Sequence, residues 1–192
     1  PSCAATHPPL DALTTIVRRE HLTAYQIAAI DVEVDSMTPR LLIHPNPSTA
    51  LEAKFSMPFC AAAAVVFPRI GIDTFTPESI RHSEVQSLMP RVSLRANAAF
   101  DTAAPLSQAT VTVRLHDDRA WSQHADGARG YPGRLTDEEL SAKFEDCAAR
   151  TLGASAAHDA WNMLTAWFAG AHGGDVRAMT SLIAGRIPSA RK

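Results

Sequence analysis

Apolar and acidic residues alternate in one segment near the start of the chain. Ile30, Val32 and Val34 are separated by single acidic residues, and this period of two is typical of a β-strand with one buried and one wet face. The same alternation at 92–95 predicts a second strand. The segment 37–43 is expected to continue the first strand or to pair with it.

Longer segments show the spacing of helices. Apolar residues predict a helix over 8–20 that begins at a pair of prolines and buries one face. The segment 57–67 is the longest uncharged block and contains four consecutive alanines, which predicts a helix buried on all sides. A capping box begins a further helix at about residue 136. The other predicted elements are a β-hairpin of 110–115 and 120–125, and helices at 77–81, 83–89, 157–171 and 176–183.

Three to four strands joined by helices and a hairpin predict an α+β fold, in which a small mixed sheet packs on helices. The 192 residues are 46% hydrophobic and 20% charged, enough for one real core. A net charge of -2 provides no basic field for a phosphate backbone, so we expect no nucleic-acid partner. No apolar run reaches the length of a membrane span, and the first residues lack the charged and then apolar pattern of a signal peptide. We therefore expect no membrane association and a cytoplasmic location, or an organellar one if a transit peptide has been removed.

The stretch before the alanine-rich segment carries a candidate binding group. Ser56 is a natural N-cap and Pro58 suits the first turn, so Lys54 lies just outside a helix N-terminus. That end has a partial positive charge and free N–H groups, so a lysine there favours an anion, such as a substrate carboxylate, between them. The alternative is a surface lysine paired with Glu52 or with solvent.

Several kinds of chemistry lack their motifs. The three cysteines form no C-x-x-C and are expected to be free thiols, and no histidine lies at ligand spacing from another histidine or cysteine, so we expect no metal. Nucleotide-binding glycine motifs and G-x-S-x-G are missing. What remains is Cys3 and His7 with Lys54 and Arg134, in which an imidazole can move protons and the cations can hold carboxylates. A lone histidine before two prolines is also often a cap or a core hydrogen-bonding residue.

Three motifs, in order and spacing, resemble the C-terminal part of the MmgE/PrpD superfamily. They are Pro1-Ser2-Cys3-Ala4-Ala5-Thr6-His7-Pro8-Pro9-Leu10-Asp11-Ala12, Leu51-Glu52-Ala53-Lys54-Phe55-Ser56-Met57-Pro58-Phe59-Cys60 and Glu139-Leu140-Ser141-Ala142-Lys143-Phe144. The family includes 2-methylcitrate dehydratase, cis-aconitate decarboxylase and iminodisuccinate epimerase, which act on small polycarboxylates without a metal or organic cofactor. The resemblance covers nearly the whole chain.

The resemblance implies a large all-helical domain and a smaller α+β lid, with the active site between them and usually in a homodimer. For this chain it implies a linking helix at 1–27, the lid at 28–150 and C-terminal helices at 151–192 that return to the helical domain. The helical half has no counterpart in the sequence and Pro1 is not a methionine. We therefore expect a fragment whose partner is the N-terminal helical half of the same protein.

Site roles follow from the matched positions. His7 matches a recurrent family position and, with Cys3, is the candidate catalytic residue. Cis-aconitate decarboxylases resembling this stretch have a catalytic histidine where this chain has Cys3, and an active-site tyrosine where it has Phe59. Dehydration or epimerisation of a polycarboxylate is therefore preferred to decarboxylation. The candidate substrate contacts are Lys54, Phe59, Arg134 and Ser2.

A rival hypothesis comes from another class of function. The 192 residues lack a complete set of acid and base groups, so the chain is alternatively a non-catalytic, truncated module that binds a protein partner through its lid surface.

Overall fold

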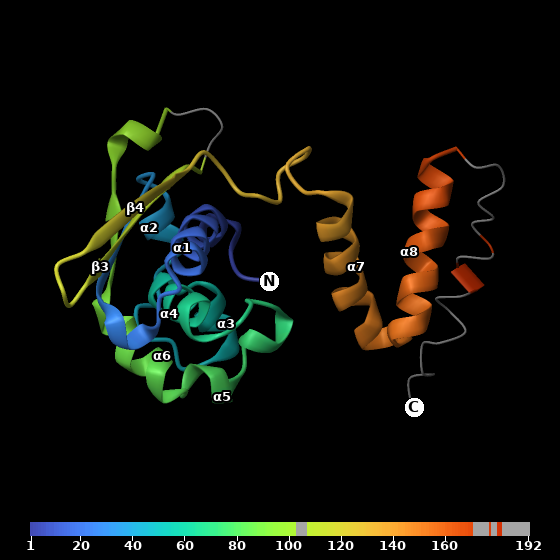
Figure 1. Cartoon of the computed structure of the whole chain (residues 1–192). Helices are drawn as coiled ribbons and strands as arrows, with labels where there is room; N and C mark the ends of the chain where they lie inside the picture. Colours follow the sequence, from blue (N-terminus) through green and yellow to red (C-terminus); the bar gives the residue numbers. More distant parts are fainter. Residues whose placement is uncertain (103–106, 171–176, 178–179, 182–192) are drawn as a thin grey trace. The chain divides into compact units, whose positions relative to one another are not determined.

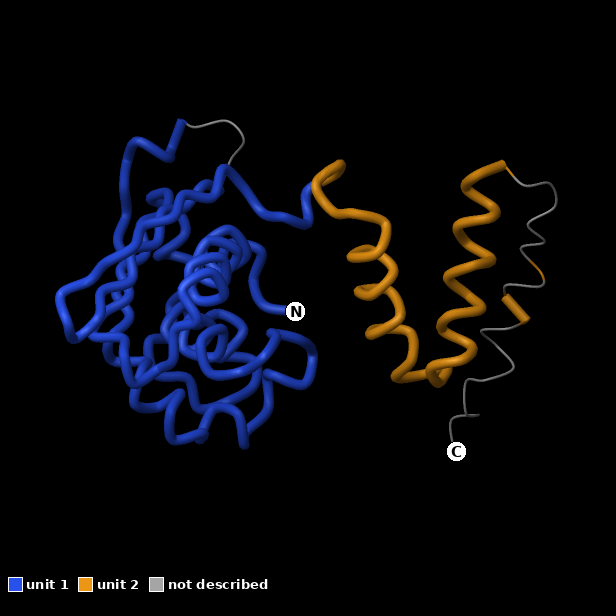
Figure 2. The backbone as a smooth tube through the Cα atoms, in the orientation of Figure 1, with its two compact units in different colours: residues 1–131 blue, residues 132–192 orange. Residues whose placement is uncertain are grey.

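The chain forms two compact units in a computed structural model that describes residues 1–102, 107–170, 177, 180 and 181. Unit 1 comprises Pro1–Tyr131 and unit 2 comprises Pro132–Lys192; both are drawn in Figures 1 and 2. Unit 1 combines a four-stranded mixed sheet with helices, and the predicted α+β class is confirmed.

The sheet has the strand order β2-β1-β3-β4. β1 (Ile27–Val34) pairs in parallel with β2 (Val92–Ala96) and antiparallel with β3 (Ala109–Leu115), and β3 forms a hairpin with β4 (Ala120–Ala125). A parallel pair needs a crossover connection, and the helices between β1 and β2, α4 (Met57–Val66) among them, supply it. The strands predicted at 30–34 and 92–95 and the hairpin are confirmed, with β1 beginning three residues earlier than expected.

The two faces of the sheet differ as the alternating pattern predicts. Val32 and Val111 are at most 1% exposed on the inner face. On the outer face, the Asp31 carboxylate accepts a hydrogen bond from Ser93 Oγ at 2.6 Å and pairs with Arg95 at 3.3 Å and with Arg114. The outer face of β2, β1 and β3 is therefore joined by one polar network.

The inner face is covered by two helices, α1 (His7–Glu20) and α4 (Met57–Val66), which contact each other (Figure 1). α1 also packs on β3 and β4, and α4 packs on β2. The remaining helices of unit 1 are short: η1 (Ala4–Thr6), η2 (Ala24–Gln26), α2 (Thr38–Leu41), α3 (Ala50–Lys54), η3 (Ile72–Thr74), α5 (Pro77–Ile80), α6 (Ser83–Leu88), η4 (Met89–Arg91) and η5 (Ala98–Phe100).

α4 is the buried helix that the sequence predicts. Its alanines from Ala61 to Ala63 are at most 1% exposed, because a methyl side chain lets neighbouring backbones approach closely. The Ser56 hydroxyl accepts the N–H of Phe59 at 3.2 Å and caps the helix, and Pro58 occupies its first turn. The predicted start and end of this helix are confirmed.

The segment 37–43 contains α2 (Thr38–Leu41) and no strand, so the prediction that it continues or pairs with the first strand is wrong. The Asp35 carboxylate accepts the N–H groups of Met37 and Thr38, both at 2.9 Å, and the Thr38 hydroxyl at 2.9 Å. These local bonds turn the chain at the end of β1. Pro39 favours the first helical turn and has no N–H for a strand ladder.

Unit 2 contains a helical hairpin of α7 (Asp137–Leu152) and α8 (Ala154–Phe168). Gly153 joins them with φ of 79°, a left-handed backbone that glycine adopts without a Cβ clash. Phe144 and Trp161 pack across the hairpin with ring centroids 5.5 Å apart. The capping box before α7 is confirmed, α8 begins at Ala154, and the helix predicted at 176–183 lies mostly outside the described residues.

The two compact units divide the chain after Tyr131. The segments 1–27, 28–150 and 151–192 that the resemblance implies stay a prediction. α1 belongs to unit 1 because its apolar face packs on the sheet and on α4, and α7 belongs with α8 because the two form one hairpin. Among the described helices, none is long and apolar enough to cross a membrane.

Candidate functional site

The N-terminal segment is attached to the end of α3 by a backbone hydrogen bond. The N–H of Cys3 donates to the carbonyl oxygen of Lys54 at 2.9 Å. The Thr6 hydroxyl is fully buried, donates to the Cys3 carbonyl at 2.8 Å and lies 2.7 Å from Ser2 Oγ. Ser2, Cys3 and Lys54, which are predicted site residues from two distant motifs, are therefore neighbours.

Lys54 is the last residue of α3 and is half-buried. Glu52, its alternative partner, accepts hydrogen bonds from Ser48 N–H at 2.7 Å, Ser48 Oγ at 2.9 Å and Thr49 N–H at 3.3 Å. These bonds, first that from the Ser48 backbone, lower the pKa of the Glu52 carboxyl. Within the described part of the chain, the Lys54 ammonium has no hydrogen-bond or ion-pair partner, which leaves its charge available to an anion.

The N–H groups at the start of α4 are not exposed beside Lys54 as the sequence suggested. Ser56 and Met57 are both 0% exposed. The hydroxyl of Ser56 takes the N–H of Phe59, and its carbonyl takes the N–H of Cys60 at 3.0 Å. An anion at this junction therefore meets the lysine side chain and not a row of backbone donors.

The thiols of Cys3 and Cys60 lie in different environments. Cys60 is 0% exposed, and its thiol donates to the carbonyl of Ala53 at 3.5 Å. Burial raises the pKa of the Cys60 thiol to about 12, against a smaller lowering by a hydrogen bond from Ser2. Cys60 is therefore a neutral core thiol. Cys3 is half-buried, and all three cysteines of the chain are free thiols.

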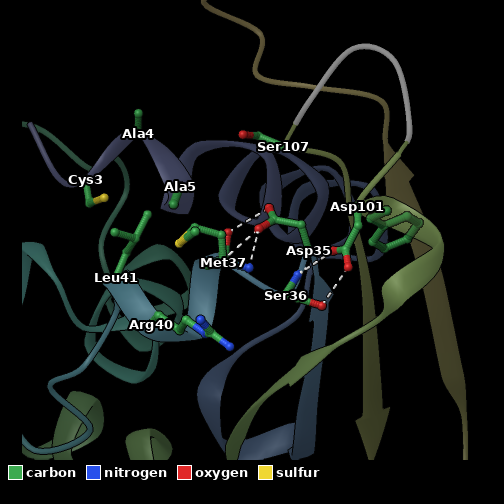
Figure 3. Close-up of a pocket in the computed structure, with 12 residues that line it drawn as sticks. Cys3, Ala4, Ala5, Asp35, Ser36, Met37, Arg40, Leu41, Asp101 and Ser107 are labelled. Carbon is green, nitrogen blue, oxygen red and sulfur yellow. Dashed lines mark hydrogen bonds between the residues drawn. The ribbon is translucent and has the colours of Figure 1, made fainter.

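A pocket of about 600 Å³ opens beside Cys3 (Figure 3). Three parts of unit 1 form its walls: the N-terminal segment, the turn from β1 into α2, and the region around η5. Of the predicted site residues, this pocket includes Cys3. The full lining is Cys3, Ala4, Ala5, Asp35, Ser36, Met37, Thr38, Arg40, Leu41, Phe100, Asp101 and Ser107.

The charged residues of this pocket differ in how many hydrogen bonds and ion pairs they form. Asp35 holds the start of α2, and Asp101 accepts the Ser36 N–H at 2.7 Å and its hydroxyl at 2.9 Å. The bond from the Ser36 backbone is the main reason why the pKa of Asp101 is lowered. Arg40 is exposed and, among the described residues, pairs with no acidic side chain. Arg40 is thus a cation of this pocket whose charge is available to a ligand.

The other predicted site residues lie elsewhere. His7 is the first residue of α1 and is half-buried. Phe59 is 0% exposed and packs against Phe75 with ring centroids 5.7 Å apart, so its assignment as a substrate contact is a prediction that its position does not support. Arg134 is exposed and belongs to unit 2; its assignment stays a prediction.

Sequence reasoning missed three residues near the site. Arg40 could have been found from Asp35, Thr38 and Pro39, because these residues form a typical helix start and place the arginine in the first turn. His44 is half-buried, and its backbone N–H donates to the carbonyl oxygen of Phe55, the residue after Lys54, at 3.4 Å. The sequence gives no signal that the Thr6 hydroxyl is buried.

The arrangement offers a thiol, two cations and hydroxyls. Among the described residues, no group of three histidine, cysteine or acidic side chains could hold a metal ion. Lysine and arginine can bind carboxylates and stabilise negative charge that develops next to them. A half-buried thiol or imidazole can exchange a proton with a bound molecule.

Residues 1–168 match the family model described as the MmgE/PrpD C-terminal domain. The chain therefore belongs to the MmgE/PrpD family, which confirms the resemblance found in the sequence.

A relative named "Cis-aconitate decarboxylase-like protein oryM", from Aspergillus oryzae, is 22% identical over 107 residues. The match covers 56% of this chain and 22% of that protein. The chain thus spans about a fifth of the length of this curated relative.

Proposed function

We propose that the chain is the C-terminal part of a lyase or isomerase of the MmgE/PrpD family, which acts on a small polycarboxylate by acid–base catalysis without a cofactor. The observation that supports this most is the junction of Lys54 with the N-terminal segment. Its ammonium has no partner in the described part of the chain, and its carbonyl holds Cys3 at 2.9 Å. The residues that carry the cation and the candidate proton-transfer group are thus joined through their backbones.

The proposed roles follow from the chemistry of a polycarboxylate. Lys54 binds a carboxylate and stabilises the negative charge that develops when a proton leaves the adjacent carbon. His7 or Cys3 takes that proton or returns one. In dehydration the leaving hydroxyl is protonated and departs as water, whereas in epimerisation the proton returns to the opposite face of the carbon. Arg134 and Ser2 are proposed as further contacts to carboxylate or hydroxyl oxygens.

The all-helical half of the same protein is the proposed partner of this chain, and a homodimer is the proposed assembly. Lys54 and Arg40 lie near Cys3, but the described residues of unit 1 do not by themselves form a complete set of acid and base groups. Residues from the helical half complete the site in this proposal.

Decarboxylation is a second candidate because the relative from Aspergillus oryzae is named a cis-aconitate decarboxylase-like protein. Against it stand Cys3 and Phe59, at positions where decarboxylases that resemble this stretch have a catalytic histidine and an active-site tyrosine. Dehydration or epimerisation is therefore the preferred reaction.

An assay of the complete polypeptide separates these reactions. Citrate, 2-methylcitrate, cis-aconitate and iminodisuccinate analogues are each supplied, and ultraviolet absorbance of an unsaturated product is followed together with carbon dioxide release. We expect absorbance to rise without carbon dioxide for a dehydratase, and proton exchange at a stereocentre for an epimerase. Carbon dioxide from cis-aconitate identifies the second candidate.

The rival is a non-catalytic module that binds a protein partner. The intact mass of the protein isolated from its source distinguishes the two. A polypeptide much longer than the 192 residues supports the enzyme. A mass equal to this chain, with no effect of any carboxylic acid on its spectra, supports the module.

A further inference from the structure

The pocket beside Cys3 has a second feature besides the thiol. Its lining includes three apolar residues, Met37, Leu41 and Phe100, together with the exposed Arg40. Figure 3 shows Met37 at the start of α2, and the side chains of Arg40 and Leu41 leaving α2 in different directions. The lining therefore combines a positive charge with apolar surface.

The two acidic residues of the pocket are engaged in holding the wall itself. Asp35 accepts three hydrogen bonds from Met37 and Thr38. Asp101 accepts two from Ser36, which fixes η5 against the same turn. Their acceptor oxygens are thus directed at backbone and hydroxyl donors of the wall, and the arginine is the charged group left for a ligand.

From this arrangement we propose that Arg40 binds a carboxylate of the substrate, while Met37, Leu41 and Phe100 contact an alkyl part of the same molecule. The inference rests on the proposed function and deepens it, because it adds a specificity-determining residue to the site that contains Cys3. A guanidinium can hold a carboxylate by two parallel hydrogen bonds, which a lysine cannot reproduce.

The same geometry gives a preference among acids. Asp35 and Asp101 line the same pocket and repel a carboxylate, so Arg40 is the lining residue that attracts one. An added methyl group meets apolar surface, and burying one such group strengthens binding by roughly fourfold. We therefore expect methylsuccinate to bind more tightly than succinate.

The test measures the complete polypeptide with Arg40→Ala and Arg40→Lys, and with Arg81→Ala as a matched control. Arg81 is 70% exposed, and its ion pair is with Glu78 of its own helix region, 3.7 Å away. Binding of tricarballylate, an acid that cannot be dehydrated, is measured by calorimetry, and KM and kcat are measured for any acid that is turned over. We expect Arg40→Ala to weaken binding at least about tenfold, Arg40→Lys to fall between, and Arg81→Ala to match the parent protein.

The outcomes separate this inference from the proposed function. Turnover with equal KM in the two alanine variants overturns the role of Arg40 and leaves the function standing. Binding that depends on Arg40 without turnover of any acid supports the pocket and contradicts the enzyme. If the protein neither binds nor turns over any of these acids, both the inference and the proposed function are overturned. If Arg40→Ala fails to fold, the comparison of Arg40→Lys with the parent decides, and equal affinities overturn the inference.

Discussion

In unit 1, Phe59 has no exposed surface, whereas in unit 2 Phe168 exposes 81% of its surface. The difference extends to the elements around them. α4 buries seven of its ten residues, whereas α7 buries none and α8 buries only Ala156, Ala157 and Ala160. Within the described residues, unit 1 supplies its own core, and the hairpin of unit 2 leaves large apolar side chains exposed.

This comparison separates two sources of stability. In unit 1 the buried sheet face and two helices remove a continuous apolar surface from water, which is the main driving force of folding. In unit 2, capping and local polar bonds contribute a larger share, because little apolar surface is buried between its helices. Equal substitutions in the two units should therefore have unequal effects.

The largest contrast is expected for a pair of phenylalanines. Phe59→Ala removes a fully buried ring and should lower the free energy of unfolding by about 3–5 kcal/mol. Phe168→Ala removes an exposed ring and should change it by less than about 0.5 kcal/mol. Urea unfolding of the 192-residue chain, followed by circular dichroism, measures both. Equal losses would show that the two units do not differ as described.

A smaller contrast is expected for two helix caps. Ser56 is buried and caps α4, and Thr136 is exposed and caps α7 by the same bond to the third residue of the helix. Loss of a cap costs about 0.5–2 kcal/mol. We expect Ser56→Ala near the upper end, because it also leaves a buried N–H of Phe59 without a partner, and Thr136→Ala near the lower end. The same unfolding experiment measures them, and the reverse order would contradict the prediction.

The smallest effect is expected for a polar bond between the helices of unit 2. His158 Nδ1 lies 3.0 Å from Glu145 Oε1, and this bond is the main reason why the pKa of Glu145 is lowered. A carboxyl with a lowered folded-state pKa stabilises the fold above its ordinary pKa of 4.5, and this contribution is lost as pH falls through the lowered value.

The check is the thermal stability of the chain between neutral and acidic pH. His158→Ala should reduce the loss of stability on acidification, while the parent chain shows the full loss. Asp146→Ala, which removes an ion pair of 3.7 Å with Arg150 within α7 itself, serves as a control for a pair that does not join the two helices. If His158→Ala loses as much thermal stability on acidification as the parent chain, the bond does not stabilise the hairpin.

How far the sequence predicted the fold can be seen at β1 and α2. The alternation at Ile30, Val32 and Val34 fixed a strand because a period of two admits no helix that buries one face. The next segment was predicted wrongly because its apolar residues fit a strand as well as a short helix. The helix forms there because the Asp35 carboxylate accepts hydrogen bonds from the backbone N–H groups of Met37 and Thr38.

The candidate site shows the same limit. Lys54 was found from its place before a capped helix, and the motif at the start of the chain identified Cys3. Their proximity depends on a backbone bond between residues 51 positions apart, which local patterns do not specify. Phe59 was expected in a pocket because its position matched a motif, but burial against Phe75 places it in the core.

The central claim is that the Lys54 ammonium binds a carboxylate next to Cys3. Steady-state kinetics of Lys54→Ala in the complete polypeptide test it most directly, with Lys143→Ala, an exposed lysine of α7, as the matched control. We predict that kcat/KM for a di- or tricarboxylate falls by an amount worth about 1–3 kcal/mol in Lys54→Ala and stays unchanged in Lys143→Ala. Equal kinetics in both variants and the parent protein would contradict the claim and remove Lys54 from the site.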